Sequence, residues 1–236
     1  MKIALLGYGK MGKTIHKIAE DRNHSIVYKT IDKPNFDEVI KADVAIEFSI
    51  PEAAFSNISN CLKNQIPVVS GTTGWLDNFH KAVDLANQEH SKFLYASNFS
   101  VGVNLFFKLN EVLAKLMSSH TDYDVSMTEI HHLEKKDAPS GTAISLADQI
   151  INHTQYKTWS HPPKTNKVND IAIEALRQEN VHGTHIINYS SEIDDIQIKH
   201  EAHSRQGFAL GAVLAAEWLV KQKNYGSYSM SDVLNI

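Results

Sequence analysis

The N-terminal segment of the chain contains a glycine turn that lies between an apolar run and an amphipathic segment. Lys2–Leu6 is the apolar run, the turn reads Gly7-Tyr-Gly9-Lys-Met-Gly12, and apolar residues recur after it at Ile15 and Ile18. In a dinucleotide-binding turn of this spacing, the first glycine permits a tight bend, the second lets the backbone approach a pyrophosphate, and the third lets the helix pack on the strand. A glycine-rich turn can also join a strand to a helix without any ligand. The order of strand, turn and helix predicts dinucleotide binding here.

The alternation of strand-like and helix-like segments continues through the first hundred residues. Apolar strand patterns occur at 2–6, 25–31, 42–48, 66–70 and 93–96, with helical patterns between them. Such alternation predicts an α/β fold with a Rossmann-like, doubly wound parallel sheet. Ligands of these sheets bind at the carboxyl ends of the strands. Three of those ends carry small or hydroxyl residues that would let a flat cofactor approach: Gly7, Phe48-Ser49 and Gly71-Thr72-Thr73-Gly74.

Two charged residues follow the second predicted strand, where a bound cofactor would place its adenosine ribose. An acid at this position, as Asp32 is, accepts hydrogen bonds from the ribose hydroxyls of NAD, whereas a base such as Lys33 neutralises the additional phosphate of NADP. The pair could also belong to a simple surface turn. The sequence therefore leaves the choice between NADH and NADPH open.

The pattern of segments changes after residue 104. We expect a helix at 105–117 that buries Leu105, Leu109, Val112, Leu113 and Leu116, then a strand at 123–130, a helix at 142–151 and a surface excursion at 153–170. Three further strands at 171–177, 184–191 and 194–202 predict an α+β domain with an open mixed or antiparallel sheet, one face of which another subunit could cover. The apolar segment 208–221 should return to the first domain. The predicted domains are thus 1–103 with 206–236 for the dinucleotide, and 104–205 for the substrate and for oligomerisation.

The segment Glu129–Ala143 gathers groups that could hold a small dianion. His131 and His132 can carry protons near neutral pH, and Lys135 and Lys136 are fixed cations. The segment then opens into a helix, whose first N–H groups form an anion seat and which Asp137 should cap. These N–H groups belong to Ser140, Gly141 and Thr142. A solvated polar loop before an ordinary helix start is the alternative interpretation.

Composition limits the classes of function that remain. A net charge of −4 and a pI near 6.3 argue against a nucleic-acid-binding protein. A single cysteine, Cys61, excludes an intramolecular disulfide, and the start of the chain shows no signal-peptide pattern. The most apolar stretch, 207–220, is too short to span a bilayer and contains Glu217. We therefore expect a cytoplasmic protein with neither nucleic acid nor membrane among its partners.

The chain contains 13 histidines, which raises the question of a metal site. His182 with His185, and His200 with His203, are each three residues apart, and residues three apart on a strand point to opposite faces. No cysteine or carboxylate cluster accompanies them at ligand spacing, so we expect no metal. Arg205 is a fixed cation near a predicted domain junction, where it could hold a hinge, bind an anion or form a surface salt bridge.

Taken together, these motifs resemble the 4-hydroxy-tetrahydrodipicolinate reductase (dihydrodipicolinate reductase) family, which acts in the diaminopimelate route to lysine. The similarity covers most of the chain, and the motif at 129–143 is its most specific part. In chain order, the shared motifs are Gly7–Gly12, Glu47-Phe48-Ser49-x-Pro51-Glu52, Gly71–Gly74, Asn98–Asn104, Glu129–Ala143, Gly183-x-His185 and Ser204-Arg205.

The resemblance implies a role for particular residues. His131 would be the general acid, Lys135 the second proton donor or a substrate cation, and His132, Gly141 and Thr142 the carboxylate site. The implied cofactor residues are Gly7, Gly9, Lys10, Met11 and Gly12 at the pyrophosphate, Asp32 and Lys33 at the ribose, and Phe48, Gly71, Thr73, Ala96, Ser97, Asn98 and Phe99 at the nicotinamide end. It also implies a homotetramer joined through the C-terminal sheets.

The implied reaction is hydride transfer from NADPH or NADH to a cyclic, conjugated imine dicarboxylate. His131 would protonate the enamine that develops as hydride adds, and hinges near 101–104 and 205–208 would let the domains close. Two other interpretations remain: another NAD(P)-dependent amino-acid dehydrogenase, or a non-catalytic NAD(P)-binding regulatory protein. The former would not need two carboxylates to be bound, and the latter would have no use for His131, Lys135 and Thr142 together.

Overall fold

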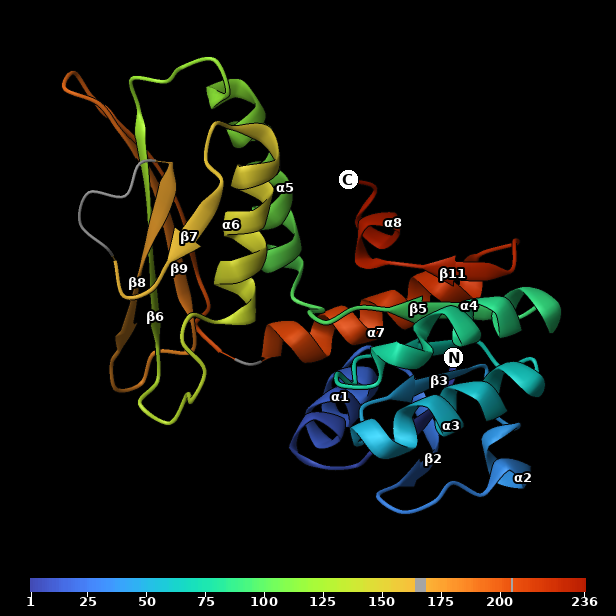
Figure 1. The fold of residues 1–236 in the computed structure, drawn as a ribbon. Helices are drawn as coiled ribbons and strands as arrows, with labels where there is room; N and C mark the ends of the chain where they lie inside the picture. Colours follow the sequence, from blue (N-terminus) through green and yellow to red (C-terminus); the bar gives the residue numbers. More distant parts are fainter. Residues whose placement is uncertain (164–168, 205) are drawn as a thin grey trace. The chain divides into compact units, whose positions relative to one another are not determined.

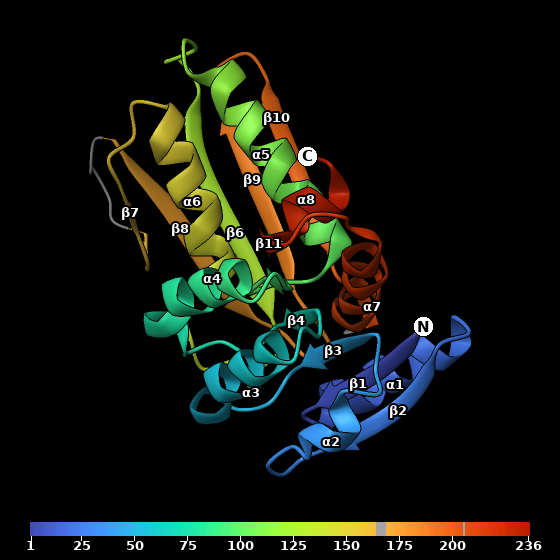
Figure 2. The same cartoon turned by 90° about the vertical axis from the view of Figure 1, so that its right-hand side faces the viewer.

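The computed structural model describes residues 1–163, 169–204 and 206–236 of the 236-residue chain. The chain divides into two compact units: unit 1 comprises Met1–Asn104 and Gln206–Ile236, and unit 2 comprises Leu105–Arg205. Figures 1 and 2 show the course of the chain through both units in two views. Arg205, to which the sequence assigned a hinge or an anion, lies outside the described residues.

Unit 1 is built on a six-stranded sheet in which every pairing is parallel. Its strand order is β11-β5-β4-β3-β1-β2. The strands are β1 (Lys2–Leu6), β2 (Ser25–Thr30), β3 (Val44–Glu47), β4 (Val68–Ser70), β5 (Lys92–Tyr95) and β11 (Gly226–Tyr228). The helices of this unit are α1 (Lys10–Asp21), α2 (Phe36–Val39), α3 (Pro51–Lys63), η1 (Leu76–Asn78), α4 (Phe79–Gln88), α7 (Gln206–Lys221) and α8 (Met230–Leu234). The expected doubly wound fold is confirmed.

Both faces of this sheet are buried, and β1 shows how. Ile3 and Leu5 belong to one apolar cluster, which includes α1 and α7, whereas Ala4 and Leu6 belong to a second cluster with α3 and α4. Successive strand residues point to opposite faces, so a strand with helices on both sides must be apolar throughout. This explains why the chain begins with an unbroken apolar run.

The helix α7 lies in the core of unit 1, although the whole of residues 105–205 separates it from the N-terminal part of that unit. Seven of its residues are buried, and its neighbours include α1, β3, β4 and β5. A Cβ atom at Gly211 would lie 1.7 Å from the carbonyl oxygen of Phe99, so only glycine permits this close approach. The return of the C-terminal segment to the first part of the chain, expected from its apolar sequence, is thus observed.

Unit 2 contains a five-stranded mixed sheet of order β10-β9-β6-β8-β7. Its strands are β6 (Asp124–His131), β7 (Thr158–Ser160), β8 (Asp170–Arg177), β9 (Thr184–Ser190) and β10 (Asp195–Glu201). β6 pairs with β8 in parallel and with β9 antiparallel. The helices α5 (Val101–Met117) and α6 (Gly141–His153) lie against one face of this sheet (Figure 1) and contribute Phe106, Ala114, Leu146 and Ile150 to its core. The sequence missed β7, which falls within the expected surface excursion at 153–170; residues 164–168 of that stretch lie outside the described residues.

The orientation of α5 differs from the sequence prediction. Leu105, Leu109, Val112 and Leu116 were expected to be buried, but they are between 43% and 66% exposed. The helix instead turns Phe106, Ala114 and Met117 toward the sheet. Asn110 is fully buried on the same side, because its Nδ2 atom donates to the carbonyl oxygen of Leu146 in α6 at 3.1 Å. The spacing of apolar residues therefore predicted the wrong face of α5 to be buried, because the buried face contains this polar residue.

A helix that crosses a bilayer needs about 20 mostly apolar residues. Among the described residues, no helix combines the length and the apolar character that crossing a bilayer requires.

Candidate functional site

The glycine turn has the conformation that a dinucleotide-binding turn needs. Gly7 has φ +103°, and a Cβ atom there would lie 2.0 Å from the carbonyl oxygen of Phe48. A Cβ atom at Gly12 would lie 2.2 Å from the carbonyl oxygen of Gly7, so Gly12 serves the packing of α1 on the turn. Gly9, in contrast, faces open space and is the N-cap of α1 without any side-chain hydrogen bond. The first N–H groups of α1 therefore point toward a space that an anionic group could fill.

A cavity of about 530 Å³ opens beside this turn within unit 1. It brings together five of the residues that the sequence assigned to the cofactor: Gly7, Gly9, Asp32, Lys33 and Phe48. Its remaining lining residues are Tyr8, Ile31, Pro34, Ser49, Ile50, Glu52, Ala53, Ser56 and Asn57. Asp32 and Lys33 are both exposed, so a ribose hydroxyl and a phosphate are equally accessible to them.

The other residues assigned to the cofactor do not line this cavity. Lys10, Met11, Gly12, Gly71, Thr73, Ala96, Ser97, Asn98 and Phe99 lie outside its lining. Ala96 and Phe99 are 9% and 2% exposed and belong to the apolar core of unit 1. Their side chains can influence a cofactor only through the groups that they support.

The ring of Phe48 lines the cavity and also contacts the buried Phe99. The two rings lie against each other, with 5.6 Å between centroids, and a Cβ atom at Gly71 would lie 2.3 Å from the Phe48 ring. Gly71 is therefore required by the position of Phe48. The carboxyl ends of β3, β4 and β5 thus meet at one aromatic ring that also lines the cavity.

A buried carboxylate organises the same strand ends. Glu47 is 0% exposed, and its two oxygens accept hydrogen bonds from Ser70 Oγ at 2.7 Å, Thr72 Oγ1 at 3.0 Å and the Ser49 backbone N–H at 3.0 Å. The Ser49 hydroxyl donates to it as well. These donors come from the last residue of β4 and from the loops that follow β3 and β4, so Glu47 fixes the positions of Phe48 and Gly71. The sequence included Glu47 in a motif but assigned it no role.

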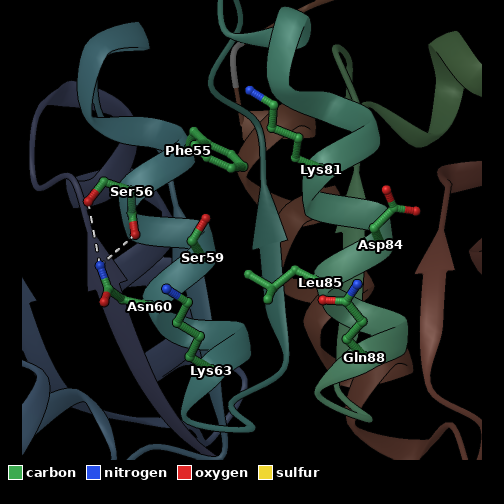
Figure 3. A pocket seen from close by; sticks show the side chains of 9 residues that line it. All are labelled: Phe55, Ser56, Ser59, Asn60, Lys63, Lys81, Asp84, Leu85 and Gln88. Carbon is green, nitrogen blue, oxygen red and sulfur yellow. Dashed lines mark hydrogen bonds between the residues drawn. The ribbon is translucent and has the colours of Figure 1, made fainter.

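A second hollow in unit 1, of about 570 Å³, lies between α3 and α4 (Figure 3). Its walls include Phe55 and Leu85, with Lys63 and Lys81 also among its lining residues. None of the sequence-predicted site residues is among its lining residues. Its lining residues come from α3 and α4 alone.

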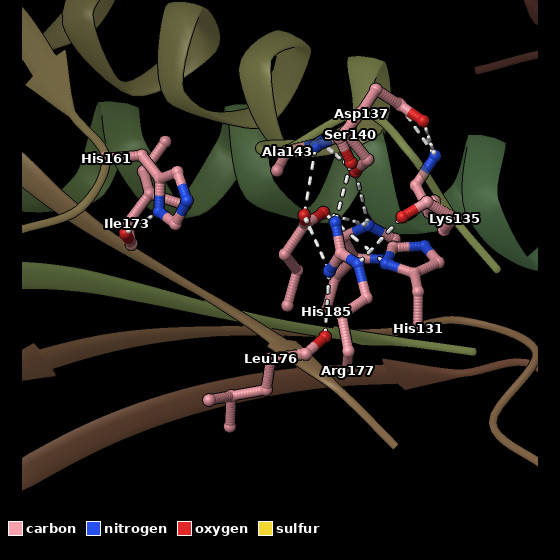
Figure 4. A network of polar contacts seen from close by, with 11 residues as sticks. His131, Lys135, Asp137, Ser140, Ala143, His161, Ile173, Leu176, Arg177 and His185 are labelled. Atoms are coloured by element: carbon pink, nitrogen blue, oxygen red, sulfur yellow. Dashed lines mark hydrogen bonds and ion pairs between the residues drawn. The ribbon is translucent and has the colours of Figure 1, made fainter. Parts of the chain in front are cut away.

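In unit 2, three neighbouring strands deliver their charged side chains to one place. Glu129 and His131 lie two residues apart on β6 and therefore point to the same face. The sheet register puts His185 of β9 opposite Glu129, and Arg177 of β8 opposite His131. Figure 4 shows His131, Arg177 and His185 close together near Ser140, while His161 lies apart from them.

Glu129 is the centre of this network and is only 1% exposed. Its Oε2 atom lies 3.6 Å from His131 Nδ1 and 3.7 Å from His185 Nε2. Its Oε1 atom accepts a 3.0 Å hydrogen bond from the Ser140 N–H and lies 3.7 Å from an Arg177 guanidinium nitrogen. A carboxylate this deeply buried is stable only with such compensation.

Burial and charge shift the proton affinities of this network. Burial alone would raise the pKa of Glu129, but contacts with His185 and Ser140 and the charge of His131 outweigh it and lower that pKa to about 2. Burial lowers the pKa of His131 to about 4; Glu129 opposes this shift, while His185, Lys135 and Arg177 add to it. The His131 imidazole is therefore neutral at pH 7 in the chain without ligand.

The loop between β6 and α6 corrects the capping prediction. Asp137 does not cap α6; its carboxylate pairs with Lys135 Nζ at 2.7 and 2.8 Å. Ser140 is the N-cap, because its hydroxyl accepts from the Ala143 N–H at 3.2 Å. The Ser140 N–H is itself taken by Glu129. The anion seat is therefore reduced from three N–H groups to those of Gly141 and Thr142.

The residues assigned to the substrate differ in their exposure. Gly141 is exposed, and its missing side chain would meet open space, while His132 and Thr142 are half-buried. Arg177 holds the preceding loop by donating to the carbonyl oxygens of Asp137 at 2.6 Å and Lys135 at 3.3 Å. The sequence named all of these positions except Arg177.

Metal binding was considered for the same cluster. One ligand atom each from Glu129, His131 and His185 lies within 4.8 Å of the other two. The sequence argument against metal compared histidines within single strands and did not foresee this combination across β6 and β9. The Ser140 N–H donates to Glu129 Oε1, and a guanidinium nitrogen of Arg177 lies 3.7 Å from the same oxygen, while Oε2 faces the two imidazoles. A fixed cation this close to the carboxylate favours an ion-pair network over a metal site.

Two family models together match almost the whole chain. The model for the N-terminus of dihydrodipicolinate reductase matches residues 1–99, and the model for its C-terminus matches residues 102–234.

This chain belongs to the dihydrodipicolinate reductase family.

Curated relatives agree with this assignment over their full lengths. The 4-hydroxy-tetrahydrodipicolinate reductase of Christiangramia forsetii is 53% identical over 238 residues, which cover 100% of this chain and 98% of that protein. The enzyme of the same name from Rickettsia bellii is 39% identical, with 95% and 90% covered. The resemblance drawn from the motifs is confirmed. The chain is an NAD(P)H-dependent oxidoreductase and belongs to a family of reductases in lysine biosynthesis.

Solved structures share the fold at lower identity. A dipicolinate-bound dihydrodipicolinate reductase from Paenisporosarcina sp. TG-14 has a TM-score of 0.81 at 23% identity and covers 97% of both chains. An amine dehydrogenase from Mycobacterium smegmatis has a TM-score of 0.59 at 8% identity, with 97% and 94% covered. The architecture is therefore shared by reductases and dehydrogenases of differing sequence.

Four residues receive a role only from the structure: Glu47, Glu129, Arg177 and His185. Glu47, Glu129 and His185 each stand in a motif of the family, and the motif was a signal for them. Arg177 closes a predicted strand and carries no local signal. Its role depends on the pairing of β8 with β6, which a single sequence does not reveal.

Proposed function

We propose that this chain reduces 4-hydroxy-tetrahydrodipicolinate with NADH or NADPH, and that His131 and Lys135 carry the proton chemistry. The observation that supports this most strongly is the juxtaposition of His131, Lys135 and the free start of α6 in unit 2. Cations, a titratable imidazole and unpaired amide N–H groups suit a substrate with two carboxylates. A regulatory protein that only bound the dinucleotide would have no need of them.

The cavity beside the glycine turn fits the cofactor. Gly9 leaves space for a pyrophosphate at the start of α1, Asp32 and Lys33 stand where the ribose would lie, and Phe48 would meet the nicotinamide end. When bound, the reduced nicotinamide supplies a hydride. Lys10, Met11 and Gly12 would act from the first turn of α1, and Gly71, Thr73 and Ala96–Phe99 from the strand ends beyond the cavity.

The substrate carboxylates would bind at the start of α6. The N–H groups of Gly141 and Thr142 would donate to one carboxylate, and His132 and Lys135 would supply charge. Lys135 is already paired with Asp137, which is 59% exposed at its side chain, so a substrate carboxylate can replace that partner at small cost. The pair keeps the lysine in place before the substrate arrives.

His131 would provide the proton that the reaction consumes. Loss of water from the hydroxy substrate gives a conjugated imine, hydride addition moves an electron pair toward the ring nitrogen, and the resulting enamine takes up one proton. Because Nδ1 of His131 faces Glu129, Nε2 is the nitrogen available to the substrate. General acid catalysis of this kind contributes about 10²–10⁴-fold.

Substitution of the two lysines separates this proposal from a general electrostatic effect. The substrate would be made in the assay from pyruvate and aspartate semialdehyde, and oxidation of NADH and NADPH followed in parallel. We expect Lys135→Ala and His131→Gln each to lower turnover by about 10²-fold or more, with cofactor affinity unchanged. Lys136→Ala, at the exposed neighbouring position, is the matched control and should retain turnover. A loss of cofactor affinity in the first two variants would refute the assignment of binding to the two units.

We also propose that copies of this chain associate as a homotetramer through the sheet of unit 2. Within the described residues of this unit, α5 and α6 cover one face of the sheet, and no helix of the unit covers the other (Figure 1). That second face presents Ser126, Thr128, Ile130 and Ile186, which are small or β-branched and suit sheet-to-sheet packing. Light scattering coupled to size-exclusion chromatography should give four times the mass of one chain, which Ile186→Arg should reduce. A monomeric mass for the unaltered chain would refute this.

A further inference from the structure

We propose that Glu129 and His185 are positioning residues for His131, and that His185 limits how strongly Glu129 holds the proton of His131. The inference rests on the proposed role of His131 as proton donor. It concerns buried residues behind the proposed substrate site: Glu129 and His185 contact Ser140, the buried N-cap of α6, whereas the proposed carboxylate seat is formed by the N–H groups of Gly141 and Thr142.

The buried polar atoms of this group face one another without other partners. Glu129 Oε2 and His131 Nδ1 are both buried and have no hydrogen-bond partner within 3.5 Å among the described residues. They lie 3.6 Å apart, so a small adjustment of either side chain closes a direct hydrogen bond. Such a bond would fix the ring orientation and direct Nε2 outward.

His185 competes for the same carboxylate oxygen. Its Nε2 atom lies 3.7 Å from Glu129 Oε2, almost the same distance as His131 Nδ1. The two imidazoles meet edge to face, with 5.2 Å between ring centroids. Ser140 holds His185 in this position, because its hydroxyl lies 3.3 Å from His185 Nε2. Glu129 Oε2 is thus within reach of both imidazoles. An interaction of this oxygen with His185 weakens its interaction with His131.

The charged groups around His131 come from every element packed against it. β6 contributes Glu129, β9 contributes His185, β8 contributes Arg177, and the loop after β6 contributes Lys135. Behind His185, His200 of β10 stands opposite it in the sheet register. Glu129 is the only anion in this set, and among the described residues the remaining members are cations or groups that can become cations. The division of the Glu129 interaction between His131 and His185 therefore decides whether His131 keeps a proton.

Opposite effects are expected when each positioning residue is changed. Glu129→Gln preserves the acceptor for the Ser140 N–H but removes the charge, so His131 should lose its proton at lower pH. His185→Phe fills the same space, removes the competitor and its repulsion, and should let His131 keep its proton to higher pH. His185→Gln retains a neutral donor to Glu129 and should restore behaviour close to that of the unaltered chain.

The test is a nuclear magnetic resonance titration of the His131 imidazole in the full chain, combined with the pH profile of turnover. We expect the pKa of His131 to fall in Glu129→Gln and to rise in His185→Phe, with the basic limb of the turnover profile moving in the same directions. At pH 7, turnover of Glu129→Gln should fall by about 10–100-fold, with KM for NADH within about twofold of its original value. His161→Gln, which changes a histidine of unit 2 outside the network, is the matched control and should leave the titration unchanged.

Several results would overturn the inference. These are shifts of the His131 pKa in the same direction for both variants, or an unchanged titration in both. Shifts that appear only with added Zn²⁺ and vanish with a chelator would replace the inference by a metal site. Failure of the proposed function is distinguishable: if His131→Gln retains full turnover, the proton-donor role is wrong, whereas the titration still reports whether Glu129 and His185 control the imidazole. Circular dichroism of each variant confirms that it is folded before titration.

Discussion

At the scale of single residues, His131 poses the sharpest question about protonation. Burial lowers its pKa to about 4, whereas a general acid working at neutral pH must carry a proton. A bound dianion would supply the missing stabilisation, since an opposite charge nearby favours the charged imidazole. The proton would then be taken up together with the substrate, which matches the one proton that the reaction consumes.

This account predicts that a dianionic ligand raises the pKa of His131. Addition of a pyridine dicarboxylate to the chain should move the titration of the His131 imidazole upward by about one unit or more, which corresponds to about 1.4 kcal/mol of interaction. The measurement is a nuclear magnetic resonance titration with and without the ligand, with a monocarboxylate of the same ring as the control. An unchanged or lowered pKa would show that the dianion binds away from His131.

In unit 1, the buried carboxylate of Glu47 holds the strand ends beside the cavity, and its substitution tests that role. Glu47→Gln keeps the shape of the side chain but replaces one acceptor oxygen by a donor, so at least one of its donors loses its partner. We expect NADH affinity to fall by about fivefold or more, corresponding to about 1 kcal/mol, because Phe48 and Gly71 lose their common anchor. Fluorescence titration with NADH would measure this. Glu38→Gln, at an exposed helix position, should bind NADH normally; equal affinity in both variants would contradict the role given to Glu47.

The residue assignments show how far a single sequence reaches. His131, Lys135, Gly141 and Thr142 could be named because they stand close together in the chain. Glu129 and His185 meet only through the pairing of β6 with β9, and Asp137 was wrongly assigned to the helix cap because Ser140 is equally suited to capping. Local chemistry allowed a prediction for residues of one continuous segment, but it could not reveal partners on different strands.

At the scale of elements, an ion-pair cluster ties the end of α1 and the start of β2 to α7. Arg22 makes two 2.8 Å hydrogen bonds to the Glu217 carboxylate, and His24 makes a third at 2.7 Å. The hydrogen bonds from Arg22 lower the pKa of Glu217 to about 2, against the opposing effect of burial and with help from His24. The cluster therefore joins the first crossover of the sheet to the helix that returns from the far end of the chain.

The sign of the linkage gives a prediction for this cluster. Because the folded pKa of Glu217 is lower than its unfolded value of 4.5, its contribution to stability is present at pH 7 and is lost as pH falls from 4.5 toward 2. Glu217→Gln should lower the free energy of unfolding by about 1–3 kcal/mol at pH 7, and by clearly less near pH 3. Urea unfolding at both pH values measures the difference. A deficit that is the same at both pH values would contradict the electrostatic origin.

The elements also differ in how well their sequences predicted them. The buried strands of unit 1 were clear, since helices on both faces make them apolar throughout. β7 and β11 have three residues each, too few for a periodic pattern. The face of α5 was wrong because Asn110 is buried through hydrogen bonds to α6, a tertiary effect that outweighs apolar spacing.

At the scale of the whole molecule, one chain contains two helix starts that we propose as anion-binding sites. α1 begins at a glycine with open space before it, which would suit a pyrophosphate. α6 begins at Ser140, whose N–H is taken by Glu129, and the remaining N–H groups of Gly141 and Thr142 would suit a small dicarboxylate. Both proposed sites would use the same physical property of a helix N-terminus, and the surrounding residues would decide which anion each accepts.

The most direct test of this account is a crystal structure of the chain with NADH and a pyridine dicarboxylate bound together. We expect one carboxylate within about 3 Å of the Thr142 N–H and of Lys135 Nζ, with His131 Nε2 facing the ring and the nicotinamide stacked over it. A ring bound elsewhere, or with His131 and Lys135 turned away from it, would contradict the central claim that the start of α6 holds the substrate.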